Sequence, residues 1–130
     1  MRAYKVVRRE GEKLISAVVR GRAEVEYKKG TWVSPPDWLK DRGYLLTAFE
    51  SLDSALRFFL IEKTTQESLE IWEAEVRGWR RPQLPMLVMS RLGEGKISYY
   101  KYYRDWPSGT IMARELKLLK KINLEHFKYL

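Results

Sequence analysis

The chain has 130 residues, no cysteine and one histidine, and its 25 Lys and Arg against 17 Asp and Glu give a formal net charge of +8. Without cysteine there are no disulfides, thiolate nucleophiles, Fe–S clusters or Cys-based zinc sites, and a lone His cannot supply the imidazoles of most zinc centres. We therefore expect one globular domain over residues 1–130 that has no bound metal and no cofactor.

The N-terminal quarter of the chain predicts a β-meander. Three short runs rich in β-branched or aromatic residues are separated by polar, Gly-bearing connections. The predicted strands are residues 3–8, 14–20 and 23–27.

A long loop is predicted over residues 28–44, because Pro35-Pro36 excludes a strand interior. Within it, residues 36–41 are expected to form one helical turn with Pro36 at its start. Trp32 and Trp38 are expected to fold back over the core, since a bare exposed Trp is uncommon.

The central helix is predicted over residues 51–62, directly after a strand at 45–49. Ser51 is a suitable N-cap, and Asp53 lies in the first turn. The apolar residues that follow recur at helical spacing; they are Leu52, Ala55, Leu56, Phe59 and Leu60. Phe59 is expected to be part of the packing face of this helix.

Further strands are predicted in the C-terminal half. The segment 69–76 alternates, with Glu73 and Glu75 on one side of the strand and Trp72 and Ala74 on the other. Residues 78–85 read as a second long loop. The remaining strand-like segments are 86–92 and 96–104, followed by a turn at 106–110. Residues 110–122 fit both a helix and a strand, and we favour a strand that closes the sheet.

These elements predict an α+β fold. It would be a mainly antiparallel sheet of about seven strands packed on one main helix, 51–62.

The segments YKVV, LLTAFESLDSALRFF, LEIWEAEV and WPSGTIMARELKLLKKI together resemble the layout of small prokaryotic and viral proteins to which no activity is assigned. In that layout Ser51 caps a helix, Ala55 and Phe59 pack, and Trp72 belongs to the core. The resemblance therefore implies structural roles for these residues and no functional ones.

A more distant likeness is to the ADP-ribosyltransferase-like fold. The stretch LLTAFESLDSALRFF is similar to its Ser-Thr-Ser strand and following helix, with Thr47 alone at the place of that motif. Glu73 and Glu75 have the spacing of its Glu-x-Glu pair. This likeness implies an alternative in which Thr47, Glu73 and Glu75 are catalytic.

The positive charge is concentrated in one part of the chain. Residues 77–121 hold 11 Lys and Arg and 3 acids, whereas the rest holds 14 basic (25 − 11) and 14 acidic (17 − 3) residues. Such asymmetry favours a polyanionic partner, a nucleic acid, or an acidic protein surface. The predicted contact residues are Arg80, Arg81, Tyr100, Lys101, Tyr102, Arg104, Lys117, Lys120 and Lys121.

Aromatic and basic residues alternate in KISYYKYYRDW, residues 96–106. As a strand, this segment places Tyr100, Tyr102 and Arg104 on one side. That strip is suited to stacking with single-stranded nucleic acid, and equally to a protein interface, where Tyr and Arg are also enriched.

We expect a small non-enzymatic binding protein with a basic, Tyr-rich face, accessory to a virus or mobile element. The alternatives are the enzyme described above and a structural or assembly subunit. The absence of a long apolar run or signal peptide predicts a cytoplasmic protein, in the host cytoplasm if viral, that does not contact membranes. The scarcity of Asn, Gln and Cys beside abundant charge predicts a thermophilic source.

Overall fold

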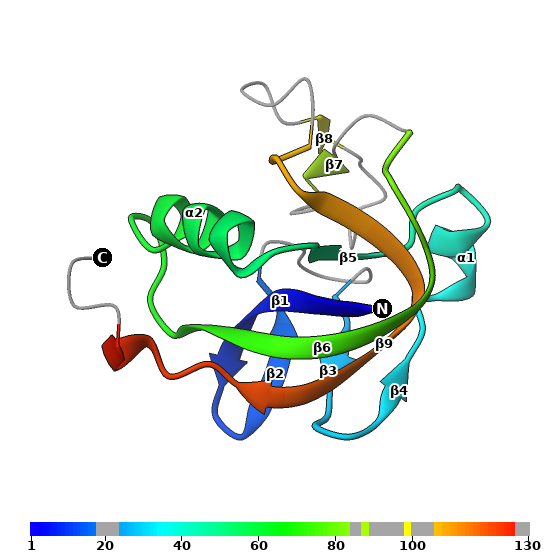
Figure 1. Ribbon diagram of the computed structural model, residues 1–130. Helices are drawn as coiled ribbons and strands as arrows, with labels where there is room; N and C mark the ends of the chain where they lie inside the picture. The colour runs from blue at the N-terminus through cyan, green and yellow to red at the C-terminus, as the bar shows by residue number, and fades with distance from the viewer. Residues whose placement is uncertain (18–23, 84–86, 89–97, 100–105, 127–130) are drawn as a thin grey trace.

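The computed structural model describes residues 1–17, 24–83, 87–88, 98–99 and 106–126, and within them the fold is built mainly of β-strands (Figure 1). The described strands are β1 (Arg2–Glu10), β2 (Lys13–Ser16), β3 (Glu26–Tyr27), β4 (Trp32–Val33), β5 (Leu46–Phe49), β6 (Leu69–Arg80), β7 (Leu87–Val88), β8 (Ser98–Tyr99) and β9 (Thr110–Lys121). The helices are α1 (Asp37–Lys40), α2 (Leu52–Glu62) and a 3₁₀ turn, η3 (Leu124–His126). Among the described residues, no helix has the length and apolar character needed to cross a bilayer.

Four of the strands form a closed ring. The long strands β6 and β9 pair with each other, β1 pairs with the other edge of β6, and β5 pairs with both β9 and β1. All of these pairings are antiparallel. The sheet is extended beyond the ring by β2 and β3 next to β1 and by β4 next to β9, while β7 and β8 form a separate two-stranded sheet. Figure 1 shows β6 and β9 side by side and strongly curved.

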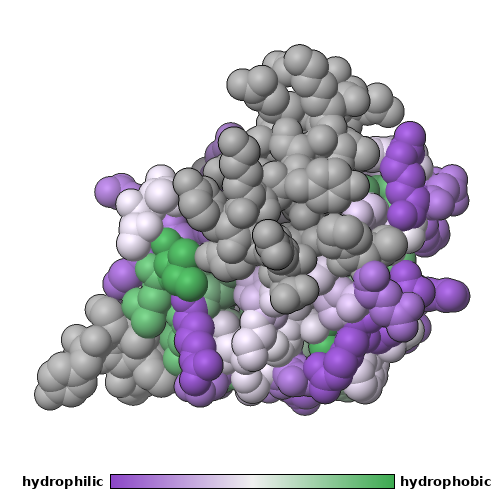
Figure 2. All heavy atoms as spheres, turned by 90° about the horizontal axis from the view of Figure 1, so that it is seen from above, coloured by the Kyte–Doolittle hydropathy of each residue, from purple (hydrophilic) through white to green (hydrophobic). Residues whose placement is uncertain are grey.

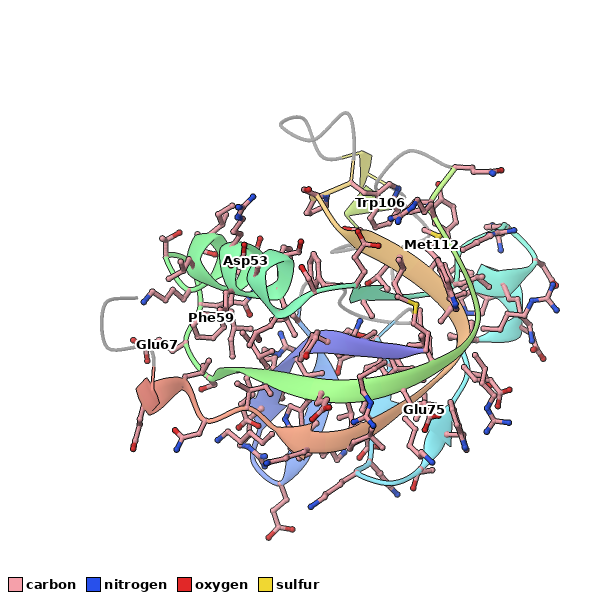
Figure 3. The ribbon with its side chains drawn as sticks, viewed as in Figure 1. Asp53, Phe59, Glu67, Glu75, Trp106 and Met112 are labelled. Carbon is pink, nitrogen blue, oxygen red and sulfur yellow. The ribbon has the colours of Figure 1, made fainter. Side chains whose placement is uncertain are left out.

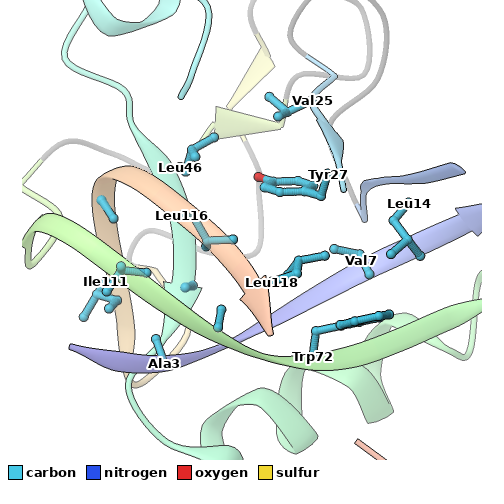
Figure 4. Close-up of a cluster of buried hydrophobic side chains, with 14 residues drawn as sticks. Ala3, Val7, Leu14, Val25, Tyr27, Leu46, Trp72, Ile111, Leu116 and Leu118 are labelled. Carbon is cyan, nitrogen blue, oxygen red and sulfur yellow. The ribbon is translucent and has the colours of Figure 1, made fainter. Parts of the chain in front are cut away.

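The main hydrophobic core fills the inside of this ring (Figure 4). Its buried members are Ala3, Val7, Leu14, Val25, Tyr27, Leu46, Ala48, Trp72, Ala74, Val76, Ile111, Ala113, Leu116 and Leu118. These residues come from every strand of the ring and, for Leu14, Val25 and Tyr27, from β2 and the β3 segment beside it, so the closed ring and these neighbouring strands together remove them from water.

Helix α2 covers part of the outside of the barrel. Its predicted cap is confirmed, since the Ser51 hydroxyl accepts a hydrogen bond from the Ser54 backbone N–H. Ala55 and Leu56 are buried in a second apolar cluster that includes Ile71 of β6. Phe59 is only half-buried, on the side of α2 that faces the strands (Figure 3). The contact between α2 and the strands is therefore centred on Ala55 and Leu56, and Phe59, which the sequence predicted for the packing face, lies at its margin.

The predicted fold class is wrong. The sequence suggested an α+β arrangement of about seven strands packed on one main helix, 51–62, but the sheet closes into a four-stranded barrel and the main core lies between strands. The physical reason is that β1 and β6 are apolar on both faces. Val6 and Ile71 face α2, whereas Val7 and Trp72 face the barrel interior. A sheet with one wet face does not have this pattern.

Several boundaries also differ from expectation. Residues 110–122 are confirmed as a strand, β9, and the helical turn after Pro36 is confirmed as α1. The loop predicted at 78–85 is wrong at its start, because β6 continues to Arg80. The loop predicted at 28–44 contains an unexpected strand, β4, on which Trp32 pairs with Lys117 of β9.

A lysine lies inside the barrel. Lys5 alternates with Ala3 and Val7 on the inner side of β1 and is only 7% exposed. Its Nζ donates hydrogen bonds to the Thr47 carbonyl oxygen (2.6 Å) and Oγ1 (3.4 Å), and it lies 5.3 Å from the centre of the Tyr27 ring. Among the described residues no carboxylate forms an ion pair with it. Burial therefore lowers the pKa of Lys5 from its ordinary 10.5 to about 8.

Replacing Lys5 by Met should remove a rise in stability with pH. The unfolded chain keeps a proton on Lys5 up to about pH 10.5, whereas the folded chain releases it near pH 8, so unfolding takes up a proton between these values. The free energy of unfolding of the parent should therefore increase by about 2 kcal/mol from pH 8 to pH 10.

Urea unfolding of the parent and of Lys5→Met at pH 8, 9 and 10 measures this rise. The titratable group beside Lys5 is Tyr27, whose pKa is raised by burial. Tyr27 therefore lowers the free energy of unfolding only near and above pH 10, where the tyrosine of the unfolded chain ionises and that of the folded chain does not. An equal rise in both proteins would contradict a lowered pKa for the buried Lys5.

Candidate functional site

The outer face of β6 and β9 carries a ladder of opposite charges. Glu75 and Arg77 of β6 lie directly across from Lys117 and Glu115 of β9. The facing side chains form ion pairs, at 3.8 Å between Glu75 and Lys117 and at 4.0 Å between Arg77 and Glu115. Because each acid has a basic neighbour, this central part of the face has little net charge.

Trp32 of β4 adds an aromatic ring to this face. The Arg77 guanidinium lies 3.4 Å from the centre of the Trp32 ring, and the Lys117 ammonium lies 4.8 Å from it. These distances are those of cation–π contacts. Trp32 is thus held against the barrel wall by two cations, and it does not act as the lid over the core that the sequence suggested.

Positive charge accumulates where β6 ends. Five exposed residues lie there, and we refer to them together as the distal basic end: Arg77, Trp79, Arg80, Arg81 and Arg114. An Arg81 guanidinium nitrogen lies 2.8 Å from a Glu50 carboxylate oxygen, and Arg80 donates to the Gly43 carbonyl at 3.2 Å. With Glu50 and Glu115 as the paired acids, four cations face two acids, a difference of +2.

Gly78 makes this arrangement sterically possible. Its φ is +60°, a left-handed conformation that residues with a Cβ adopt at a cost. A Cβ at this position would also lie 3.0–3.2 Å from the Cβ, Cγ and Cδ atoms of Arg114. The missing side chain therefore leaves room for the Arg114 side chain to lie against β6 at Gly78.

Trp79 is an exposed large hydrophobic residue within a cluster of arginines. It is 44% exposed, and Met1 and Ile61 are the other large hydrophobic residues exposed in the described part of the chain. Seen from above, hydrophobic residues gather on the side of α2, and most of the opposite side is hydrophilic (Figure 2). Trp79 is an exposed indole with arginines near it in the sequence, at positions 77, 80 and 81.

The predicted contact residues do not form one cluster. Arg80 and Arg81 belong to the distal basic end, and Lys117 lies on the central ladder. Lys120 and Lys121 lie at the far end of β9. The nine residue steps from Lys121 to Met112, the partner of Arg80, span about 30 Å of strand path. The other four predictions, Tyr100, Lys101, Tyr102 and Arg104, lie outside the described residues.

Lys121 takes part in an ionic cluster around the buried Glu70 that ties three strands together. Glu70 of β6 accepts hydrogen bonds from Arg9 of β1 and from the Trp72 indole N–H, and Lys121 of β9 lies 3.6 Å away. Burial alone would raise the pKa of Glu70, but the hydrogen bonds from Arg9 and Trp72 and the charges of Lys121 and Arg9 lower it. The carboxylate thus stays ionised and holds Lys121 in a structural role.

The residues of the enzyme alternative are not gathered around one point. Glu73 is paired with Arg2 and Glu75 with Lys117, both on the outer face of β6 (Figure 3 labels Glu75). Thr47 instead contacts Lys5, whose side chain lies in the barrel. This geometry gives Glu73 and Glu75 the role of charge partners in the ladder.

Sequence reasoning missed Trp32, Arg77, Trp79 and Arg114. For Trp79 a signal was present in GWRRP, where it stands beside the predicted Arg80 and Arg81, but the segment was interpreted as a loop without a partner strand. No family model, curated protein or solved structure matches this chain. The two resemblances therefore stay predictions, and the geometry of the chain itself is what indicates its function.

Replacing Gly78 by Ala should destabilise the fold by about 1–2 kcal/mol, because the left-handed conformation penalises a Cβ. Thermal and urea unfolding measure the loss. Gly30→Ala is a matched control, since Gly30 also has a positive φ, +77°, but nothing lies within 4 Å of its added Cβ. A larger loss at Gly78 than at Gly30 would report the contact with Arg114. A loss at Gly78 below about 0.5 kcal/mol would contradict the left-handed conformation of this residue.

Proposed function

We propose that this chain is a non-enzymatic binding protein whose distal basic end contacts the phosphate backbone of a nucleic acid. The observation that carries the proposal is the cluster of four exposed arginines at one strand end, in a chain whose excess charge lies entirely within residues 77–121. Phosphates are the polyanions for which such a cluster supplies both charge and directed hydrogen bonds.

The side chains of this cluster are suited to phosphate contact. A guanidinium presents five N–H donors in a planar fork, and Arg80 uses one nitrogen, Nη2, to donate to the Gly43 carbonyl. Arg81 is likewise held at one nitrogen by Glu50. Both guanidinium groups are therefore held in place while further donors stay available, which reduces the entropy lost on binding.

Other residues within 77–121, the segment that holds the excess positive charge, would add to this contact. Tyr100, Lys101, Tyr102 and Arg104 follow in the sequence and would enlarge a contact with a strand of nucleic acid. Lys117 lies closer to the distal basic end than Lys120 and Lys121 do, and it shares Trp32 with Arg77. An acidic protein surface would be attracted by the same charges, so the experiment must separate the two partners.

The double variant Arg80→Gln/Arg81→Gln should weaken binding to a fluorescently labelled single-stranded oligothymidylate and flatten its salt dependence. Two lost phosphate contacts should reduce the slope of log affinity against log salt by about 1.4, at roughly 0.7 per phosphate on a single strand. Fluorescence anisotropy at several salt concentrations measures both quantities.

The control is Arg57→Gln/Lys63→Gln, which removes the same charge from the exposed surface of α2 and its C-cap. It should change affinity little. Equal effects of the two double variants would reduce binding to generic attraction by a basic protein. The absence of binding at low salt would contradict the proposed function and favour an acidic protein partner.

A further inference from the structure

We infer that Trp79 is a stacking platform for an unpaired base, so that the distal basic end takes single-stranded rather than duplex nucleic acid. This inference rests on the proposed function and names the form of nucleic acid that the site would accept. It depends on three features of the described residues: the exposure of the indole, the arginines on either side of it, and the different surroundings of the other tryptophans.

Trp79 is more exposed than the other tryptophans in the described part of the chain. Trp72 is buried in the barrel core, and its indole N–H is bonded to Glu70. Trp32 is half-buried and has two cations against its ring. Trp79 alone among the described tryptophans is classed as exposed, at 44%. An indole in this position offers aromatic surface to a ligand, and its removal from water would favour binding.

The arginines are placed where a nucleotide carries its charge. Arg77 and Arg81 come two residues before and two residues after Trp79 in the sequence; Arg77 lies on β6, and Arg81 directly follows the end of β6 at Arg80. A nucleotide within a strand has a phosphate on either side of its base. A base lying on Trp79 would therefore have cationic side chains in both directions along the backbone.

A duplex does not fit this arrangement. Its bases are stacked on one another, so their faces are not available to a side chain at the surface. Single strands, in contrast, expose base faces, and the described pattern of an aromatic ring within a positively charged surface is that of proteins that bind them. Because every base has a π-face, we expect little preference for sequence.

Trp79→Ala and Trp79→Phe test the inference by fluorescence anisotropy. The probes are a labelled oligothymidylate, a labelled duplex of the same length, and inorganic polyphosphate as a competitor that has charge but no bases. For the single strand we expect Trp79→Ala to lower affinity about 5- to 150-fold, with the salt slope unchanged. Trp79→Phe should retain most of the affinity, and polyphosphate binding should be unaffected by either change.

Ile61→Ala is the matched control, because Ile61 is an exposed hydrophobic residue on α2, away from the arginines. Melting temperatures of all variants should match the parent, since Trp79 is exposed. Unchanged affinity in Trp79→Ala, together with weakened binding in Arg80→Gln/Arg81→Gln, would overturn the inference and leave the proposed function standing. If neither oligothymidylate nor polyphosphate binds at low salt, the proposed function itself fails.

Equal affinity of the parent for the duplex and the single strand would also overturn the inference. The same holds if Trp79→Ala weakens polyphosphate as much as oligothymidylate, because stacking requires a base.

Discussion

The seam between β1 and β5 is the constraint on which the barrel depends. The other pairings of the ring are longer, but β1 and β5 are joined by one residue pair, Tyr4 with Phe49. The ammonium of Lys5 adds a second link, since it donates to the Thr47 carbonyl from inside the barrel. A buried charge without a carboxylate costs stability, but an unpaired carbonyl at the seam would cost stability as well. Lys5 therefore adds the cost of a buried charge but removes that of an unpaired Thr47 carbonyl, and its hydrogen bond links β1 to β5.

Closure of the ring decides which residues reach the surface. The inside takes apolar side chains from every strand, and α2 covers part of the outside, so that charged residues of β6 and β9 are left on the remaining outer face. Along most of that face acids and bases alternate and pair. Beyond Gly78 the alternation stops, and arginines with Trp79 are left in excess. The distal basic end is thus a consequence of where the barrel ends and of the residues that follow.

The sequence predicted local features better than the closed barrel. Helix α2 was predicted from its periodicity and from Ser51, and the two faces of β6 were predicted from alternation. Ring closure was not predictable, because it depends on one pair between residues 45 positions apart, and nothing in YKVV marks Lys5 as buried. Arg80 and Arg81 were found by counting charges. Trp79 was missed because its exposure depends on β6 continuing past Val76, which local propensity did not indicate.

The most direct test of this account is a two-dimensional ¹H–¹⁵N NMR titration of the parent protein with oligothymidylate. The five tryptophans give indole N–H signals that report separately on different parts of the molecule. The account predicts that the Trp79 indole and the amides of residues 77–81 shift most, whereas the Trp72 indole, buried and bonded to Glu70, stays in place. Largest shifts on α2, or equal small shifts over the whole surface, would contradict it.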